Sequence, residues 1–584
     1  MAAAARAFAA HVLRGRWFMA YGSFLIMSAA GATYIFAVYS KDIKATLGYT
    51  QEQLNTVGFF KDVGANVGIH AGLIAEVAPP WLVLAIGAAM NLGGYLMLYL
   101  SVAGVVRARP PLWLVCLYIA VGANSQAFAN TGALVTCVKN FPESRGVILG
   151  LLKGFVGLSG AIFTQLYLAF YGGGGGDTRP LILLVGWLPA AVSVAFLGTI
   201  RIIRSPRSPA AARREYRAFC GFLYVSLALA AYLMVVIILQ KRFVFTRAEY
   251  GVSAAVVLVM VLVPFTVVLR EEAALFKNTV EAQPVVVNTP TKPRTPAQAA
   301  QQPAAIAERP AATLTSRVVR ALRPPPLGDD YTILQALVSV DMLLLFTATV
   351  FGIGGTLTAI DNMGQIGESL GYPQRSIATF VSLISIWNYL GRVAAGFASE
   401  ALLARYRLPR PLVLAVVLLL TIPGHLLISF GVPGSLYVAS VIIGFCFGAA
   451  QPLILASVSE LFGLRYYSTL YNLCGTASPV GSYVLNVRVA GRMYDREAAR
   501  QAGGHAVASA AGKRLVTCIG VRCYKESFLV ITAVTVAAAA VTLVLAWRTR
   551  RFYAGDVYAR FKEEEEVVVV GQSRDGVAAS EMSS

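Results

Sequence analysis

The sequence has 584 residues, of which 57% are hydrophobic and only 13% are charged. Soluble domains have roughly 45–50% apolar and 25% charged residues, so this composition excludes an ordinary soluble globular protein. Apolar runs of about 20 residues, the length that crosses a bilayer as a helix, recur along the chain. We therefore predict an all-α polytopic membrane protein.

Six apolar segments at the start of the chain predict transmembrane helices, at residues 17–39, 54–75, 81–105, 112–138, 147–170 and 181–200. Two further helices are predicted at residues 219–239 and 252–269. Six more follow at residues 333–360, 376–399, 412–430, 436–458, 470–487 and 528–547. The second set mirrors the first, and the predicted total is about fourteen spans.

A segment rich in proline, alanine, glutamine and charge separates the two sets and predicts a disordered linker. The predicted organisation is therefore an N-terminal six-helix bundle (1–205), two additional transmembrane helices (206–270), a cytoplasmic linker (271–330), a C-terminal six-helix bundle (331–553) and a cytoplasmic tail (554–584).

Arginine clusters at the ends of spans predict the orientation of the chain. If both termini are cytoplasmic, the clusters at residues 201–217, 405–410 and 548–551 all lie inside, as the positive-inside rule requires. Lys241 and Arg242 do not follow the rule. An anionic inner leaflet accounts for the net charge of +20 without a nucleic-acid partner. The plasma membrane, endoplasmic reticulum, vacuole and other organelles all remain open, and the basic N-terminal segment fits a signal anchor better than a transit peptide.

Cysteine and histidine positions give little indication of chemistry. Cys518 and Cys523 fall in the predicted non-cytoplasmic loop before the last span, where a disulfide could persist, and two free thiols are the alternative. The four histidines are too scattered for a metal site. No nucleophile elbow, phosphate loop or metal motif is found, so we predict no cofactor and no enzyme activity.

Charged residues inside the predicted spans are the sharpest functional signal. Lys61 and Asp62 lie in the second span and Lys153 lies in the fifth. A charge at the bilayer centre costs roughly 2.5–3.5 kcal/mol, so it tends to face a cavity or a partner. One hypothesis is that Lys153 and one of the other two line a central path, with lysine attracting an anion and Asp62 carrying a coupling proton. The alternative is a structural charge pair between the second and fifth helices.

Further polar residues extend the set of candidates. Asp341 begins the second bundle near the cytoplasmic end of its helix, where a carboxylate can reach water, and a coupling role is a minor alternative for it. Amides that can bind a solute or bridge helices are Asn124, Gln126, Asn130, Gln165, Asn388, Gln451 and Asn472.

Several long strings carry a family resemblance. They include GFFKDVGANVGIHAGLIAEVAPPW at residues 58–81, GQIGESLGY at 364–372, SELFGLRYYSTLYN at 459–472 and SPVGSYVLNVRVAGRMYDREA at 478–498. These strings resemble the plant nodulin-like branch of the major facilitator superfamily, the nuclear-fusion-defective-like proteins. The resemblance implies two six-helix bundles that rock about a central cavity, with an extra helix pair between them.

A second resemblance concerns the sequence YLGRVAAGFASEALLARYRLPRPL at residues 389–412, which is similar to the cytoplasmic hairpin signature of major facilitator transporters. The matching positions are Gly391, Arg392, Gly396, Glu400 and Arg405. By this likeness, Arg392 and Glu400 would form a charge network that latches the two bundles together on the inner side.

Two functional classes follow from these observations. The first is a secondary transporter of a small organic, carboxylate-like anion, working by alternating access in the lipid bilayer, with protons as the candidate coupling ion. The second is a membrane receptor or scaffold that kept a carrier fold without transport. The sequence makes no prediction of oligomeric state.

Overall fold

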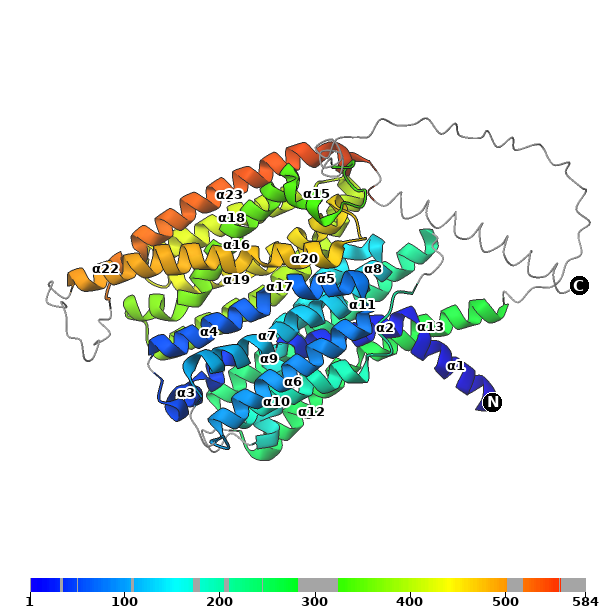
Figure 1. Cartoon of the computed structure of the whole chain (residues 1–584), viewed down its shortest axis with the longest axis horizontal. Coiled ribbons are helices and arrows are strands. Elements are labelled where there is room, and N and C mark those ends of the chain that lie inside the picture. Colours follow the sequence, from blue (N-terminus) through cyan, green and yellow to red (C-terminus); the bar gives the residue numbers. More distant parts are fainter. Residues whose placement is uncertain are drawn as a thin grey trace, which may run out of the picture.

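The computed structural model describes residues 2–31, 35–49, 51–106, 110–171, 179–203, 209–243, 245–281, 324–501, 518–555 and 557. In these ranges the regular structure is entirely helical. Most helices run side by side along one axis, with the blue to green first part of the chain on one side and the yellow to red last part on the other (Figure 1). The predicted tail and most of the predicted linker lie outside the described residues.

The first half contains both continuous and interrupted helices. They are α1 (Ala2–Arg14), α2 (Arg16–Ala30), α3 (Phe36–Leu47), α4 (Gln51–Asn66), α5 (Ile69–Val77), α6 (Pro80–Val102), α7 (Leu112–Ala129), the π-helix η2 (Asn130–Val135), α8 (Thr136–Asn140), the short 3₁₀ turn η3 (Pro142–Ser144), α9 (Arg145–Tyr171) and α10 (Arg179–Ala195). The first and second predicted spans are therefore each divided into two helices, and Gly68 lies at the break between α4 and α5.

The second half follows a similar pattern. Its helices are α15 (Ile333–Val338), α16 (Val340–Ser369), α17 (Gln374–Tyr406), α18 (Arg410–Phe430), α19 (Ser435–Leu461), α20 (Tyr467–Gly475), α21 (Ala477–Ser482), the π-helix η4 (Tyr483–Gly491), α22 (Arg492–Gln501) and α23 (Arg522–Ala554). In the described residues nine helices are long and apolar enough to cross a membrane. Several other predicted spans are interrupted helices, so the total of fourteen stays a prediction.

Three helices connect the halves: α11 (Pro209–Arg242), α12 (Arg247–Leu262) and α13 (Pro264–Glu281). The last of these continues eleven residues beyond the predicted start of the linker at 271, so that boundary was wrong. The reason is that buried Glu271 and Glu272 on α13 have partners in the rest of the protein. Glu271 pairs with Arg214 of α11 at 2.5 Å, and Glu272 accepts the backbone N–H of Trp17 at 2.9 Å.

The connecting helices are held mainly by the first half. Besides these contacts, Arg16 of α2 pairs with Glu215 of α11 at 2.6 Å, and both side chains are buried. Deeper in the bundle, the side-chain amide of Gln240 on α11 donates to Gln165 on α9 at 2.8 Å. The contacts of Glu272 and Glu215 with α2 and the amide pair with α9 therefore fix α11 and α13 to the N-terminal helices.

The two ends of the bundle are distinguished by the chain termini. Helix α2 begins and α23 ends at the same end, which we call the terminal face, and the other end is the opposite face (Figure 1). The turn between α17 and α18 belongs to the terminal face, and the turn between α18 and α19 belongs to the opposite face.

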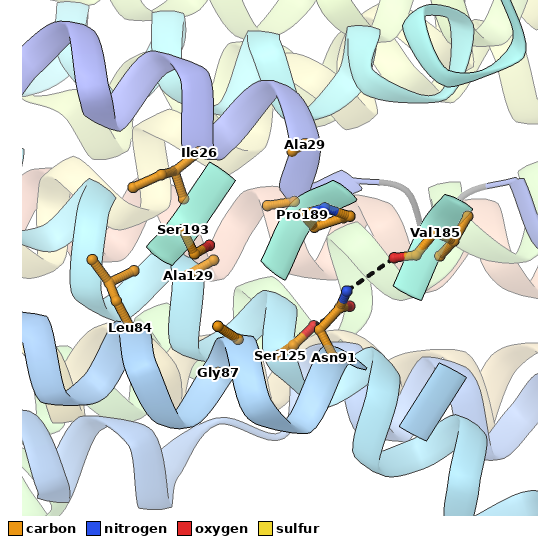
Figure 2. A pocket seen from close by; sticks show the side chains of 12 residues that line it. Ile26, Ala29, Leu84, Gly87, Asn91, Ser125, Ala129, Val185, Pro189 and Ser193 are labelled. Atoms are coloured by element: carbon orange, nitrogen blue, oxygen red, sulfur yellow. Dashed lines mark hydrogen bonds between the residues drawn. The ribbon is translucent and has the colours of Figure 1, made fainter. Parts of the chain in front are cut away.

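A proline in α10 shows how side chains of the bundle supply hydrogen bonds to backbone groups that lack a helical partner. Pro189 has no N–H, so the carbonyl of Val185 four residues earlier loses its helical donor. The side-chain amide of Asn91 on α6 donates to the carbonyl of Val185 at 2.9 Å (Figure 2). It also donates to the carbonyl of Gly186 at 2.7 Å. The adjoining cavity measures only about 20 Å³ and lies among helices of the N-terminal half, so we assign it to packing.

The opposite face carries a disulfide. Cys518 and Cys523 are joined at the start of α23 with an S–S distance of 2.09 Å. The backbone N–H of Cys518 also donates to the hydroxyl of Tyr494 on α22 at 3.1 Å. The disulfide and this hydrogen bond thus hold the start of α23 against α22.

Replacing Asn91 with leucine should destabilise the protein by about 1–2 kcal/mol, because two carbonyls lose a donor in an apolar environment. The thermal unfolding midpoint in detergent measures the effect. The exposed neighbour Leu92 provides the control, since Leu92→Ala removes no hydrogen bond. Equal midpoints for N91L and L92A would contradict this account of Asn91.

The peptide that contains Cys518 and Cys523 should resist alkylation in the folded, unreduced protein and become doubly alkylated only after reduction. Mass analysis of non-reduced and reduced digests makes the measurement, and the five free cysteines are the internal control for labelling. Free-thiol labelling of this peptide before reduction would rule the disulfide out.

Candidate functional site

A polar cavity lies between the two halves of the protein and measures about 60 Å³. The N-terminal half contributes α4, α7, η2 and α9, and the C-terminal half contributes α16, α19, α20 and α21. Its polar lining residues are Asn66, Asn130, Lys153, Thr349, Gln451, Tyr471, Asn472 and Ser478. The cavity has room for a few water molecules and enough polar groups to bind them.

Lys153 is the only basic residue in that lining. Its ammonium donates to the side-chain oxygen of Asn130 at 3.2 Å and lies 5.3 Å from the centre of the Tyr471 ring. Asn130 is the first residue of the π-helix η2. Such single-turn widenings are frequent at functional sites, and here one begins at the residue that holds the lysine.

A second buried cation lies beside Lys153. The guanidinium of Arg392 on α17 donates through Nη1 to the backbone carbonyl of Lys153 at 2.6 Å, and the residue is only 1% exposed. Its Nε has no hydrogen-bond partner among the described residues. No carboxylate in the described part of the chain forms an ion pair with Lys153 or Arg392. Two positive charges therefore meet at the interface of the halves without a fixed counter-charge.

Some of the cavity residues were outside the sequence-based candidates. Asn130, Gln451 and Asn472 are among the predicted amides, whereas Asn66 and Tyr471 are not. A signal for Asn66 was present, because it ends the helix that breaks at Gly68. Nothing in the local sequence marks Tyr471, whose ring reaches the cavity only through the packing of α20 against the first half.

The other predicted amides have structural partners or lie elsewhere. Asn124 donates to the carbonyls of Gly64 and Val67 at 2.8 and 2.7 Å, which satisfies backbone groups at the break between α4 and α5. Gln126 is buried and has its own partner in the protein. The side-chain oxygen of Asn388 is buried without a hydrogen bond to any described residue. None of these three lines the cavity.

Lys61 and Asp62 are not in the cavity either. Their side chains pair with one another at 2.8 Å on α4, about one turn beyond the cavity residue Ala65. The predicted alternative of a charge pair between the second and fifth helices is therefore wrong, because the flexible lysine reaches its sequence neighbour. Lys153 has no acidic partner on that helix.

Asp341 has a partner at the terminal face. Its carboxylate accepts from Arg548 on α23 at 2.7 and 3.4 Å, in a two-bond pairing of acid and guanidinium. This pair joins the first turn of α16 to the last part of α23 within the second half. This geometry favours a structural role for Asp341, as the acidic partner of Arg548, over a coupling role.

No ion pair joins Arg392 and Glu400, which lie about two turns apart on α17, although each of them bonds a backbone group of α9 in the first half. Glu400 instead accepts from Arg410 at 2.7 Å, and Arg410 also donates to Glu460 at 2.7 Å. One buried arginine thus bridges two carboxylates at the terminal face. Arg405 is exposed and lies over Tyr406, away from this network.

The glycines of the same motif permit close helix contacts. A side chain on Gly396 would collide with Gly150 of α9, where a Cβ would lie 2.8 Å from its Cα. Gly391 lies equally close to the backbone of Phe445 on α19. Gly396 therefore serves the contact between the halves, and Gly391 serves packing within the second half.

The terminal face is closed by further contacts between the halves. The backbone N–H of Gly146 donates to Glu400 at 3.1 Å, and Arg145 donates to the Ser459 carbonyl at 2.6 Å. Glu76 at the end of α5 accepts from the backbone and hydroxyl of Thr469 at 3.2 and 3.3 Å. These contacts separate the central cavity from the terminal face.

Comparison with known proteins gives two domain matches and several relatives. Residues 16–269 match the Nodulin-like family, and residues 329–555 match the NFD4, C-terminal domain. Protein NUCLEAR FUSION DEFECTIVE 4 of Arabidopsis thaliana is 24% identical over 550 residues, covering 92% of this chain and 89% of the relative. Probable transporter MCH1 of Yarrowia lipolytica is 29% identical over 219 residues, covering 35% of this chain and 43% of the relative.

A solved structure is similar along most of the chain. It is the major facilitator superfamily proton:xylose symporter XylE bound to 6-bromo-6-deoxy-D-glucose, with a TM-score of 0.52 and 11% sequence identity. The alignment covers 91% of this chain and 95% of that one. At this identity the likeness concerns the arrangement of helices.

Replacing Arg410 with glutamine should open the terminal face, because removing one partner of a buried ion pair costs about 3–5 kcal/mol. A cysteine at buried Ser468 reports the opening, and its alkylation by a water-soluble maleimide should accelerate roughly 10-fold or more. Arg405→Gln removes the same charge from an exposed site and should leave the rate unchanged. Equal alkylation rates in both variants would contradict the role of Arg410 in closing the terminal face.

Proposed function

We propose that the chain, which matches the nodulin-like family and has the major facilitator fold, carries a small organic anion across the membrane by alternating access. The observation that supports an anionic substrate most directly is the buried pair of cations, Lys153 and Arg392, beside the cavity between the halves. The fold and the transporter relatives point to a non-enzyme.

The energetic argument rests on missing counter-charge. Each cation inside the membrane costs roughly 2.5–3.5 kcal/mol on insertion scales, and this cost falls when an anion is close. A carboxylate in the cavity would accept hydrogen bonds from the Lys153 ammonium, whose present partner is the neutral oxygen of Asn130. Arg392 lies behind the lysine and adds positive potential at the same place. Amides of Gln451 and Asn472 would then orient the remainder of the solute.

The proposal of alternating access depends on contacts between the halves that can break at one face while others form at the opposite face. In the present conformation the contacts around Glu400, Arg145 and Glu76 close the terminal face. The close approach of α9 and α17 at Gly150 and Gly396 gives a smooth surface on which the halves can tilt. Breaking the terminal contacts would release the solute on that side, which we assign to the cytoplasm because exposed Arg405, Arg407, Arg550 and Arg551 lie there.

Protons are the coupling ion that we propose. Outside the cavity, towards the opposite face, α4 and α16 have the exposed carboxylates of Asp62 and Asp361, which are candidates for proton exchange with water. An anion that moves inward against a negative membrane potential needs a positive charge to move with it, and a proton supplies that charge.

Purified protein in liposomes should accumulate one or more carboxylates from a labelled panel of mono- and dicarboxylates, sugars and amino acids when the outside is acidic. Lys153→Met should reduce that uptake roughly 10- to 100-fold, because a charge-assisted hydrogen bond is worth about 1.5–3 kcal/mol. Lys525→Met is the matched control, since Lys525 is exposed at the opposite face.

Two results would contradict the proposal. Wild-type rates in K153M would remove the lysine from the substrate site. Accumulation of neither anions nor any other panel member by folded protein would favour the receptor or scaffold function instead.

A further inference from the structure

A second polar cluster lies between the central cavity and the opposite face. Asp361 on α16 accepts from the side-chain amide of Asn486 at 3.2 Å, and Asn362 donates to the oxygen of the same Asn486 at 2.7 Å. Asn486 belongs to the π-helix η4. Asp361 lies roughly 12 Å along α16 from the cavity residue Ile353, at 1.5 Å per residue.

Charges from the other half meet this cluster. Lys61 and Asp62 of α4 lie within electrostatic range of Asp361. Lys61 already pairs with Asp62 at 2.8 Å, so its single positive charge is compensated by that carboxylate. With all three groups ionised, the cluster has one more negative than positive charge. The two carboxylates belong to different halves, so their repulsion opposes closure of the opposite face.

The surroundings of Asp361 supply no other cation. On its own helix the nearest polar neighbour is Asn362, while η4 and α21 contribute the neutral Asn486 and Ser482. Among the described side chains of α17, α19 and α23, none contributes a charge to Asp361. Lys61 and Asp62 are therefore the charged groups of the described structure that act on it.

The position of Asp361 permits exchange with water. The residue is exposed, and its carboxylate accepts from Asn486 of η4, so water has access to it. The side chain of Asp62 is 56% exposed, whereas that of Lys61 is 15% exposed. A proton can thus reach Asp361 from the opposite face while the terminal face is closed.

Resting on the proposed transport of an anion, we propose that Asp361 is the site that binds the coupling proton. A proton from water bonds to a carboxylate oxygen of Asp361 and converts it to the neutral acid. The cluster then has one ammonium and one carboxylate, and the repulsion across the halves disappears. The opposite face closes, and the proton leaves to water on the other side after the terminal face opens.

This assignment separates the two cargo sites by charge. The anion is held by cations at the cavity, and the proton is held about two helical turns away by an acid. One proton moving with a monocarboxylate makes the transport cycle electrically neutral. The same step explains why Asp361 has amide partners, since Asn486 can donate to the carboxylate or accept from the acid.

A test without substrate measures closure of the opposite face. Spin labels at exposed Thr46 of α3 and Arg496 of α22 report the separation of the halves in protein whose five free cysteines are replaced. Lowering the pH should shorten the distance in the wild type, and Asp361→Asn should hold the short distance at every pH. The exposed acid Asp495 provides a matched control, and D495N should respond like the wild type. A wild type with no pH response, or D361N that responds normally, would overturn the proposal.

A transport test uses the carboxylate that the panel identifies. D361N should lose accumulation driven by a pH gradient and retain exchange of labelled for unlabelled carboxylate, because exchange needs no net proton movement. Asp361→Glu keeps a carboxylate at this position and should retain gradient-driven uptake. Retained uptake in D361E would show that the loss in D361N comes from the missing carboxylate and not from misfolding. Wild-type accumulation by D361N, or accumulation driven by a sodium gradient at constant pH, would overturn the proton site. If no panel member is transported by the wild type, the proposed function fails, and the spin-label experiment alone decides whether Asp361 binds a proton.

Discussion

The absence of water from the lipid core is the constraint on which this structure depends, because each backbone group and each charge there needs a partner inside the protein. Where Pro189 frees a carbonyl, Asn91 from the next helix replaces the donor. Where Gly68 interrupts a helix, Asn124 bonds the carbonyls at the break. The uncompensated cations at Lys153 and Arg392 depart from this pattern, and for this reason we propose them as the place where a ligand binds.

Charge is distributed in three levels along the interface of the halves. At the terminal face Arg410 bridges two carboxylates of the second half, and one of them, Glu400, also accepts from Gly146 of the first half. In the middle two cations lie beside a polar cavity, and towards the opposite face Lys61 pairs with Asp62 while Asp361 accepts from Asn486. An anion and a proton would therefore each find the opposite charge at separate depths, while the salt bridges of the terminal face limit which side is open.

The connecting helices have a defined place in this arrangement. Arg16 and the start of α2 bind α11 and α13 through buried acids, so these helices belong mechanically to the first half. Their contact with the second half includes one buried hydrogen bond, from Tyr389 on α17 to Ser226 on α11 at 2.7 Å. Motion between the halves can thus carry the connecting helices along with the N-terminal bundle.

The sequence by itself determined the helical class, the family and the presence of charges within spans, because apolar runs and long motifs are local properties of the chain. It placed Lys153 in the span that forms α9, whereas the motif at 389–412 lies mostly within α17, which continues to Tyr406. Only the tertiary structure decided partners: Glu400 bonds Arg410, Arg392 reaches the Lys153 carbonyl, and Asp361 accepts from Asn486. These pairings depend on which helix faces meet across the two halves, and residues hundreds of positions apart carry no local pattern that records it.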